Sequence, residues 1–200
     1  YMVDLHNAGG FPVIADHLGD SLYRDALTIT GQTLGDVVDE TKRTFAQEIV
    51  RPKSMAIHTG GSIAVLKGNL APNGAIIKQS AASDQLLQHE GRAVVFEDLE
   101  DLANRIDCED LDVAPDSVLV LRNIGPRGAP GMPEAGLIPI PKKLARQGVK
   151  DMVRISDGRM SGTAAGTIVL HVDPEAAVGG PLALVQNGDV IKLDVSNRVL

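Results

Sequence analysis

Residues 117–134 read SVLVLRNIGPRGAPGMPE, a short apolar run followed by a loop rich in glycine and proline. The apolar run, residues 117–122, is typical of a buried strand. Glycine lets a backbone approach a ligand closely, and proline holds a loop in one shape. From its spacing alone, the loop is either an ordinary surface connection with Glu134 in water or part of a binding site. It contains neither of the glycine-rich nucleotide-binding patterns.

Similar apolar runs on both sides of this stretch predict further strands at residues 62–66, 75–78, 91–96, 151–156, 167–172 and 190–195. Helical spacing of apolar residues predicts short helices over residues 97–106 and 141–147. Asn73-Gly74 suits a type I′ turn, and Asn187-Gly188 indicates a second hairpin. These elements predict an α/β fold in which a mixed, barrel-like or sandwiched sheet carries short helices.

The first 50 residues differ from the rest, because they have the polar, amphipathic pattern of helices. Thr33 is the predicted cap of one of these helices. Arg51-Pro52 ends the segment, since proline disfavours helix in the residue before it. We therefore expect one unit over residues 1–50 and another over 51–200. The start of the chain has no basic or apolar leader, and we expect the chain to belong to a longer protein.

Composition narrows the class of protein. The formal net charge is −7, and the chain has no tryptophan, two tyrosines and three phenylalanines. This argues against nucleic acid and anionic membranes as partners, because both require a basic surface. The single cysteine, Cys108, excludes an internal disulfide and fits a reducing cytoplasm. One cysteine is also too few for a complete iron–sulfur or zinc–thiolate site.

A second candidate loop reads DGRMSGT at residues 157–163 and directly follows a predicted strand. The hydroxyl of Ser161 in this loop is a candidate nucleophile or base. The alternative is a hairpin turn whose serine bonds its own backbone. A serine hydrolase that uses Ser161 and His171 is disfavoured, because the glycine spacing differs from G-x-S-x-G and no acid partner is identifiable.

The two loops together resemble known signatures. Residues 122–134, RNIGPRGAPGMPE, resemble the R-N-x-G-P-x-G-x-P-G-M-x-E signature of the dihydroxy-acid dehydratase and phosphogluconate dehydratase family. Residues 157–162 resemble its D-G-R-[FM]-S-G signature. Residues 68–72 and 171–181 match two further motifs, and all four occur in the family's order. Met160 and Pro133 look more like the sugar-acid branch, with the branched-chain dihydroxy-acid dehydratases as the alternative.

This resemblance implies a fold and an activity. The fold is a swivelling, mixed β-barrel domain preceded by the end of an N-terminal domain. The activity is removal of water from a 2,3-dihydroxy sugar acid, which gives a 2-keto-3-deoxy acid. The resemblance implies a [2Fe–2S] or [4Fe–4S] cluster held by cysteines of the N-terminal domain, and a Mg²⁺ ion at the carboxylate end of the substrate. The expected partners are that domain and further copies in a homo-oligomer.

The resemblance also implies roles for five residues. Glu134 is expected to bind Mg²⁺, and Ser161 is expected to take the C2 proton. Arg159, Thr163 and Met132 are the expected substrate-binding residues. Arg159 has an alternative role that we favour, in which it braces its own loop by pairing with the aspartate two positions earlier. We expect the chain alone to be inactive. A non-catalytic binding or assembly module of the same fold is the remaining alternative.

Overall fold

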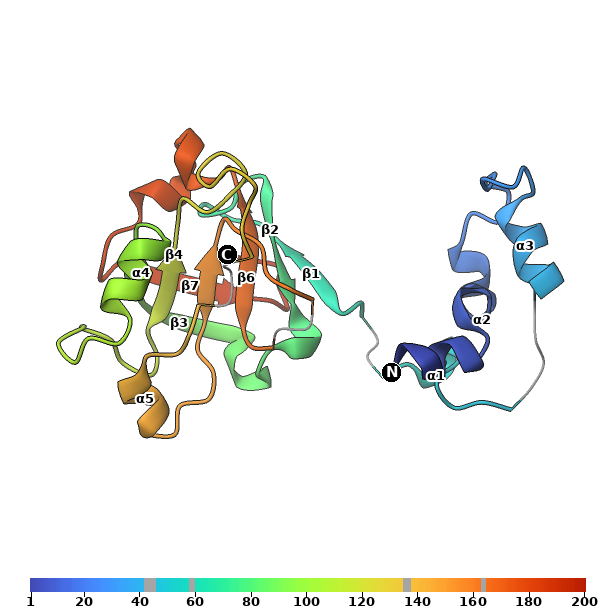
Figure 1. Ribbon diagram of the computed structural model, residues 1–200, viewed down its shortest axis with the longest axis horizontal. Helices are drawn as coiled ribbons and strands as arrows, with labels where there is room; N and C mark the ends of the chain where they lie inside the picture. The colour runs from blue at the N-terminus through green and yellow to red at the C-terminus, as the bar shows by residue number, and fades with distance from the viewer. Residues whose placement is uncertain (42–45, 58–59, 135–137, 163–164) are drawn as a thin grey trace. The chain divides into compact units, whose positions relative to one another are not determined.

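The computed structural model describes residues 1–41, 46–57, 60–134, 138–162 and 165–200. The chain forms two compact units, Tyr1–Gly60 and Gly61–Leu200 (Figure 1). Among the described residues, no helix has both the length and the apolar character needed to cross a membrane.

The first unit is helical, as the sequence predicted. Thr33 caps a helix here, because the Asp36 N–H donates to its Oγ1 at 3.1 Å and its own N–H donates to Asp36 Oδ2 at 3.1 Å. Val13, Ala15 and Val38 form the buried side of the unit. The helices are α1 (Met2–Asn7), α2 (Gly10–Leu18) and α3 (Leu34–Thr41), with 3-10 turns η1 (Gly19–Ser21) and η2 (Lys53–Met55).

The second unit is built on a mixed sheet, and its described residues form seven strands in the order β1-β2-β6-β5-β4-β3-β7. Strands β6, β5, β4 and β3 are parallel to one another, and the other pairs are antiparallel. The strands are β1 (Ile63–Leu66), β2 (Gly74–Lys78), β3 (Gln88–Phe96), β4 (Val118–Leu121), β5 (Arg154–Ser156), β6 (Ile168–Asp173) and β7 (Val190–Asp194).

Short helices and turns join these strands. The two α-helices are α4 (Leu99–Arg105) and α5 (Lys142–Arg146). The 3-10 turns are η3 (Gln79–Ala81), η4 (Asp84–Leu86), η5 (Ala176–Val178) and η6 (Pro181–Leu184). The α/β class with a mixed sheet and short helices is therefore confirmed.

The sheet curls into a barrel-like form because β3 belongs to two parts of it. Its first residues pair with β7 and its last four pair with β4, and in Figure 1 it runs across the direction of β4, β5 and β6. The C-terminal residues then link the sheet's two ends. Val199 pairs with Asp194 at the end of β7, and the Leu200 N–H donates to the Lys67 carbonyl, just after β1, at 3.0 Å.

This closure requires a glycine at position 68. A Cβ atom there would lie 1.8 Å from the carbonyl oxygen of Leu200. Real non-bonded contacts between carbon and oxygen are about twice as long. The Gly68 position of the GNLAP motif therefore has a structural reason, which is the close approach of the chain's last residue.

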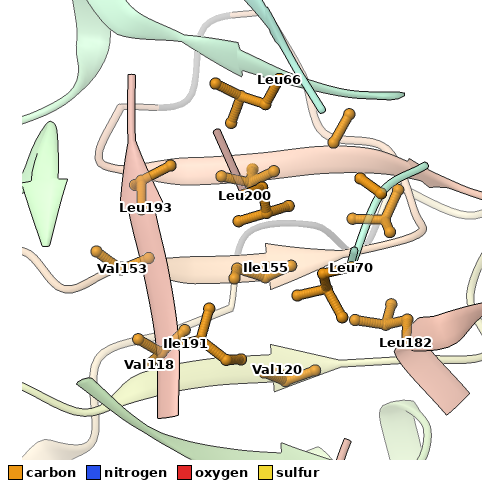
Figure 2. Packing of buried hydrophobic residues seen from close by; sticks show 14 of the residues in the cluster. Leu66, Leu70, Val118, Val120, Val153, Ile155, Leu182, Ile191, Leu193 and Leu200 are labelled. Carbon is orange, nitrogen blue, oxygen red and sulfur yellow. The ribbon is translucent and has the colours of Figure 1, made fainter. Parts of the chain in front are cut away.

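Apolar residues occupy both faces of the parallel strands, as expected for strands that are covered on both sides. Val118 and Val120 of β4 point into the barrel, in the same apolar cluster as Ile155 and Ile191 (Figure 2). The alternate β4 residues, Leu119 and Leu121, lie in a second cluster that contains residues of α4 and α5. Residues Val118–Leu121 of the apolar run thus form a central, fully buried strand.

Neither Asn-Gly prediction is correct, because Asn73-Gly74 forms no type I′ turn and Asn187-Gly188 forms a turn but no hairpin. Gly74 has a φ of 132°, but Asn73 is not among the described residues with positive φ, so the pair cannot form a type I′ turn. Asn187-Gly188 precedes β7, whose partner is β3 rather than the preceding strand. The Asn187 side chain instead accepts a hydrogen bond from the Val95 N–H at 2.7 Å, which is a long-range contact that the dipeptide alone does not reveal.

Candidate functional site

The two candidate loops leave the sheet at the same edge. One follows β4 and the other follows β5, and these strands are parallel neighbours in which Leu121 pairs with Ser156. Because the carboxyl ends of parallel strands face the same way, the loops after them lie side by side. The sequence placed both loops after strands, and the parallel pairing brings them together.

Asp157 ties three motifs together from a buried position. Its side chain is 1% exposed, and its carboxylate accepts hydrogen bonds from the backbone N–H groups of Asn123, Ile124 and Ala176 at 3.2, 3.1 and 2.9 Å. These donors lie in the loop after β4 and in the segment after β6. Asp157 therefore fixes the start of the Ser161 loop against both neighbours, and it does not brace Arg159 as we had favoured.

Glu175 holds the glycine- and proline-rich loop in the same way. This carboxylate is 7% exposed and accepts from the Arg127 N–H at 2.8 Å and from the Gly128 N–H at 3.4 Å. Gly125 is needed for this approach, since a Cβ atom there would lie 2.1 Å from Glu175 Oε2. The glycine at position 125 thus has a physical cause, which is contact with a buried carboxylate.

Arg159 links the two loops directly. Its Nε donates to the carbonyl oxygen of Met132 at 2.7 Å, and its Nη1 lies 3.8 Å from Glu134 Oε1. The Arg159 and Glu134 side chains are 46% and 51% exposed, so both remain open to a ligand. The structure therefore brings together three of the five expected site residues, namely Met132, Glu134 and Arg159.

The backbone turns sharply just before Glu134. Gly131 and Met132 have φ values of 85° and 45°, and the Met132 N–H donates to the Ala129 carbonyl at 2.8 Å. A non-glycine residue in the left-handed region is uncommon and is often found where function requires it. The turn directs the Met132 carbonyl to Arg159 in the neighbouring loop.

Ser161 lies in the middle of the second loop and is partly exposed. The Lys78 ammonium, at the end of β2, donates to the carbonyl oxygen of Gly162. On the other side of the loop, the His171 N–H of β6 donates to the Gly158 carbonyl at 3.1 Å. Thr163, an expected substrate-binding residue, lies outside the described residues.

A buried ion pair holds the two segments that follow the candidate loops, at Ile138 and at Thr167. Arg154, which is 4% exposed, donates to Asp151 Oδ1 at 2.7 Å and to the Ile138 carbonyl at 3.0 Å. Asp151 also accepts from the hydroxyls of Ser83 and Thr167, each at 2.7 Å. Burial acts to raise the pKa of Asp151, but these hydrogen bonds and the Arg154 charge outweigh it and lower the pKa below its ordinary value.

Sequence reasoning missed the positioning roles of Asp157, Glu175 and the Asp151–Arg154 pair. Each of these acidic residues lies within three positions of the end of β5 or β6, or just before the start of β5. A charge so close to buried strands needs a partner, because an unpaired buried charge is strongly unfavourable. This rule predicts from the sequence that these acidic residues have partners, but it does not identify the partners.

Glu134 is suited to be one ligand of a hard cation. A half-exposed carboxylate such as Glu134 is the type of oxygen ligand that Mg²⁺ prefers. Within the described parts of the chain, no group of three or more histidine, cysteine, aspartate and glutamate side chains could hold a metal ion. The Cys108 thiol donates to the Asn104 carbonyl at 3.2 Å, and one thiol does not fit the usual ligand set of an iron–sulfur cluster.

A barrel-like α/β domain that carries the Glu134 loop and the Ser161 loop at one edge has the arrangement expected of a dehydratase C-terminal domain. The family model described as Dihydroxy-acid/6-phosphogluconate dehydratase C-terminal matches residues 48–200. The chain belongs to this family.

The chain is similar over nearly its whole length to proteins named as dehydratases. It is 51% identical over 201 residues to an L-arabinonate dehydratase of Rhizobium leguminosarum bv. trifolii, covering 100% of the chain and 34% of that protein. It is 54% identical over 196 residues to an L-arabonate dehydratase of Azospirillum brasilense, covering 96% and 33%. A dihydroxy-acid dehydratase of Syntrophobacter fumaroxidans is 43% identical over 202 residues, covering 100% and 36%. The chain thus spans about a third of the length of these relatives.

Proposed function

We propose that the chain is the C-terminal part of a hydro-lyase that dehydrates a 2,3-dihydroxy sugar acid to a 2-keto-3-deoxy acid. In this proposal Ser161 is the base and Glu134 is a ligand of Mg²⁺. The main support is the contact of Arg159 with the Met132 carbonyl, which joins the loop that carries Glu134 to the loop that carries Ser161.

Residues 1–50 are, in the same proposal, the end of the N-terminal domain, and residues 51–200 are the C-terminal barrel. The relatives are about three times longer than this chain, which leaves room for such a domain. That domain would supply the cysteines of the iron–sulfur cluster, because Cys108 alone cannot. The working site would then lie where two domains meet, which is a common location for ligand sites.

The reaction consists of one proton transfer, one bond cleavage and a tautomerisation. As an alkoxide, which a divalent cation beside it would stabilise, the Ser161 oxygen takes the proton from C2 and the C–H electron pair forms a C2=C3 bond. The 3-hydroxyl leaves as hydroxide and takes that proton back from Ser161, which gives water. The resulting enol becomes a 2-keto group as C3 gains a proton, so the net loss is one water. When bound, Mg²⁺ and the cluster supply Lewis-acid stabilisation of the carboxylate and of the leaving hydroxyl.

The chain's own residues contribute position and charge. Arg159 is exposed enough to pair with a substrate carboxylate or hydroxyl while it holds the Met132 carbonyl. Thr163 and Met132 complete the proposed substrate contacts. Asp157 and Glu175 hold both loops through backbone donors, so the geometry is set before substrate binds, and such preorganisation lowers the barrier to reaction.

The sugar-acid branch is favoured by the relatives. Proteins named for arabinonate, arabonate or sulfogluconate are 48–54% identical, whereas a dihydroxy-acid dehydratase is 43% identical. A branched-chain substrate is the alternative, and a substrate panel separates the two.

The test uses the full-length protein under anaerobic conditions, with aldonates and 2,3-dihydroxy-isovalerate as substrates. We expect turnover of aldonates and a fall in kcat of about 10²- to 10⁴-fold for Ser161→Ala, the range for loss of a general base. The absorption spectrum of the cluster should be unchanged. Ser80→Ala is the matched control, because Ser80 is exposed and lies in η3, outside the two candidate loops. A Ser161→Ala protein that keeps most of its activity would overturn the assignment of the base, and turnover of the branched acid alone would overturn the substrate class.

A further inference from the structure

Lys78 makes a contact that the proposed mechanism does not use. It is the last residue of β2, and its ammonium donates to the carbonyl oxygen of Gly162, which lies 84 positions further along the chain. Gly162 directly follows Ser161. A charged side chain from a different strand therefore meets the peptide next to the proposed base.

Two further hydrogen bonds join the segment after β2 to Gly166 and Thr167, just before β6. The Gly166 N–H donates to the Ala81 carbonyl at 2.8 Å. The Ser83 N–H then donates to Thr167 Oγ1 at 3.1 Å. Residues 78–83 thus lie along Gly162, Gly166 and Thr167, and Lys78 ties the residue that directly follows Ser161.

The position of this tie within the loop matters. The start of the loop is fixed by Asp157, and Arg159 is fixed to the Met132 carbonyl. Gly162 is exposed, and a glycine backbone is freer than that of any other residue. The tie from Lys78 adds a fixed point at the residue that directly follows Ser161.

The choice of lysine is informative. Ordering a long side chain costs rotamer entropy, and an exposed carbonyl could accept from water instead. A charged donor makes a hydrogen bond about twice as strong as a neutral one. The strand neighbour of Lys78 across β1 is the apolar Ile63, which does not compete for the ammonium.

We propose that Lys78 is a positioning residue for Ser161, acting through the Gly162 carbonyl that it holds. The inference rests on the proposed function, since Ser161 is the base there. Lys78 fixes the peptide plane after Ser161, and so keeps the hydroxyl aimed at the C2 proton. Misplacing a reacting group by about 1 Å costs about 100-fold in rate, so a single tie at this point is sufficient to affect kcat.

The experiment compares Lys78→Met, Lys78→Arg and the control Lys192→Met in the full-length protein. Methionine keeps the length of the side chain but has no donor, and arginine keeps both donor and charge. Lys192 is an exposed lysine of β7, outside the two loops. Amide hydrogen exchange is measured for residues 157–162. The kcat and KM are measured on aldonates.

We expect Lys78→Met to speed exchange in residues 157–162 and to lower kcat by about 10- to 100-fold with KM within about twofold. Lys78→Arg should restore most of both, and Lys192→Met should match wild type. Unchanged exchange in Lys78→Met would overturn the tie, and unchanged kcat would overturn its role in the reaction. Equal loss in the methionine and arginine variants, with a lowered Tm, would show a merely structural residue.

The failure of this inference is distinguishable from the failure of the proposed function. A wild-type protein that turns over no dihydroxy acid, or a Ser161→Ala variant with full activity, overturns the proposed function and the catalytic role of Lys78 with it. The exchange measurement does not depend on activity, so it decides in either case whether Lys78 holds the loop.

Discussion

Glu134 is the acidic residue on which the metal proposal depends. It lies half-exposed beside Arg159, whose Nη1 is 3.8 Å away. A guanidinium at that distance partly neutralises the carboxylate, and a divalent cation would compete with it for the same oxygens. Metal binding and the Arg159 contact are therefore linked at this residue.

We expect Glu134→Gln to weaken Mg²⁺ binding, because a neutral amide is a poorer ligand than a carboxylate. In the full-length protein, the Mg²⁺ concentration for half-maximal activity should rise by about tenfold or more, since even residues outside the first coordination shell change metal affinity by about 10- to 100-fold. A titration of activity against Mg²⁺ measures this. Glu100→Gln, at an exposed position of α4, is the control. An unchanged midpoint would remove Glu134 from the metal site.

Asp151 gives a prediction about pH and stability. Its pKa is lowered in the folded protein, so it binds its proton more weakly there than in the unfolded chain. Its contribution to stability is therefore complete above its unfolded pKa of about 4, and is lost as the pH falls through the lower folded value. Arg154 stays charged throughout, and it loses its oppositely charged partner when Asp151 is protonated.

We expect Asp151→Asn to lower the Tm at pH 7, because removing one partner of a buried pair costs about 3–5 kcal/mol. The difference from wild type should shrink as the pH falls below about 4. Thermal unfolding between pH 7 and pH 3 measures both. Asp107→Asn is the control, since the Asp107–Lys142 pair is exposed and exposed pairs contribute about 0–1 kcal/mol. A difference that stays constant with pH would contradict the assignment.

At the scale of elements, the glycine- and proline-rich part of the loop after β4 is held by the Glu175 carboxylate. The backbone N–H groups of Arg127 and Gly128 both donate to the carboxylate of Glu175, which lies two residues after the end of β6. The loop that carries Glu134 is therefore fixed by a different element from the strand that leads into it. Loss of this anchor should affect the loop while the sheet persists.

We expect Glu175→Ala to speed hydrogen exchange in residues 125–134 and to destabilise the protein by about 1.5–3 kcal/mol, the net contribution of a hydrogen bond to a charged group. Glu175→Gln should fall between this variant and wild type, because it keeps an acceptor oxygen without the charge. Exchange in β4 should be the same in all three. If residues 125–134 exchange at the wild-type rate in Glu175→Ala, then Glu175 does not hold the loop.

The elements themselves were largely predictable, and their connections were not. Val118 to Leu121 form a strand because four consecutive apolar residues suit a strand buried on both faces, and that pattern is local. Asn187 shows the limit of local patterns, because its side chain bonds Val95 on a distant strand. The anchors Asp157 and Glu175 were missed for the same reason. Their partners are backbone N–H groups of distant loops, which no spacing rule identifies.

At the scale of the whole barrel, closure depends on the last residues of the chain. Leu200 donates to the Lys67 carbonyl, and its own carbonyl lies where a Cβ atom of residue 68 would be. Gly68→Ala should therefore displace the chain at Leu200 and destabilise the barrel by about 1–3 kcal/mol, as overpacking does. Thermal unfolding measures the loss. Gly61→Ala is the matched control, because the nearest atom to its Cβ lies 3.8 Å away, an ordinary contact. Equal stability of the two variants would contradict this account of closure.

The final prediction concerns the chain alone. Its one cysteine cannot hold a cluster of the usual kind, and its described residues bring no set of three metal ligands together. The chain is also only about a third of the length of its relatives. We therefore expect the 200-residue chain, supplied with iron and Mg²⁺ under anaerobic conditions, to fold and yet to show no turnover of aldonates, whereas the full-length protein turns them over. Circular dichroism confirms folding, and a 2-keto-acid assay measures turnover. Measurable turnover by the folded chain would mean that its own residues form a complete site, and the proposed division of the active site between two domains would be wrong.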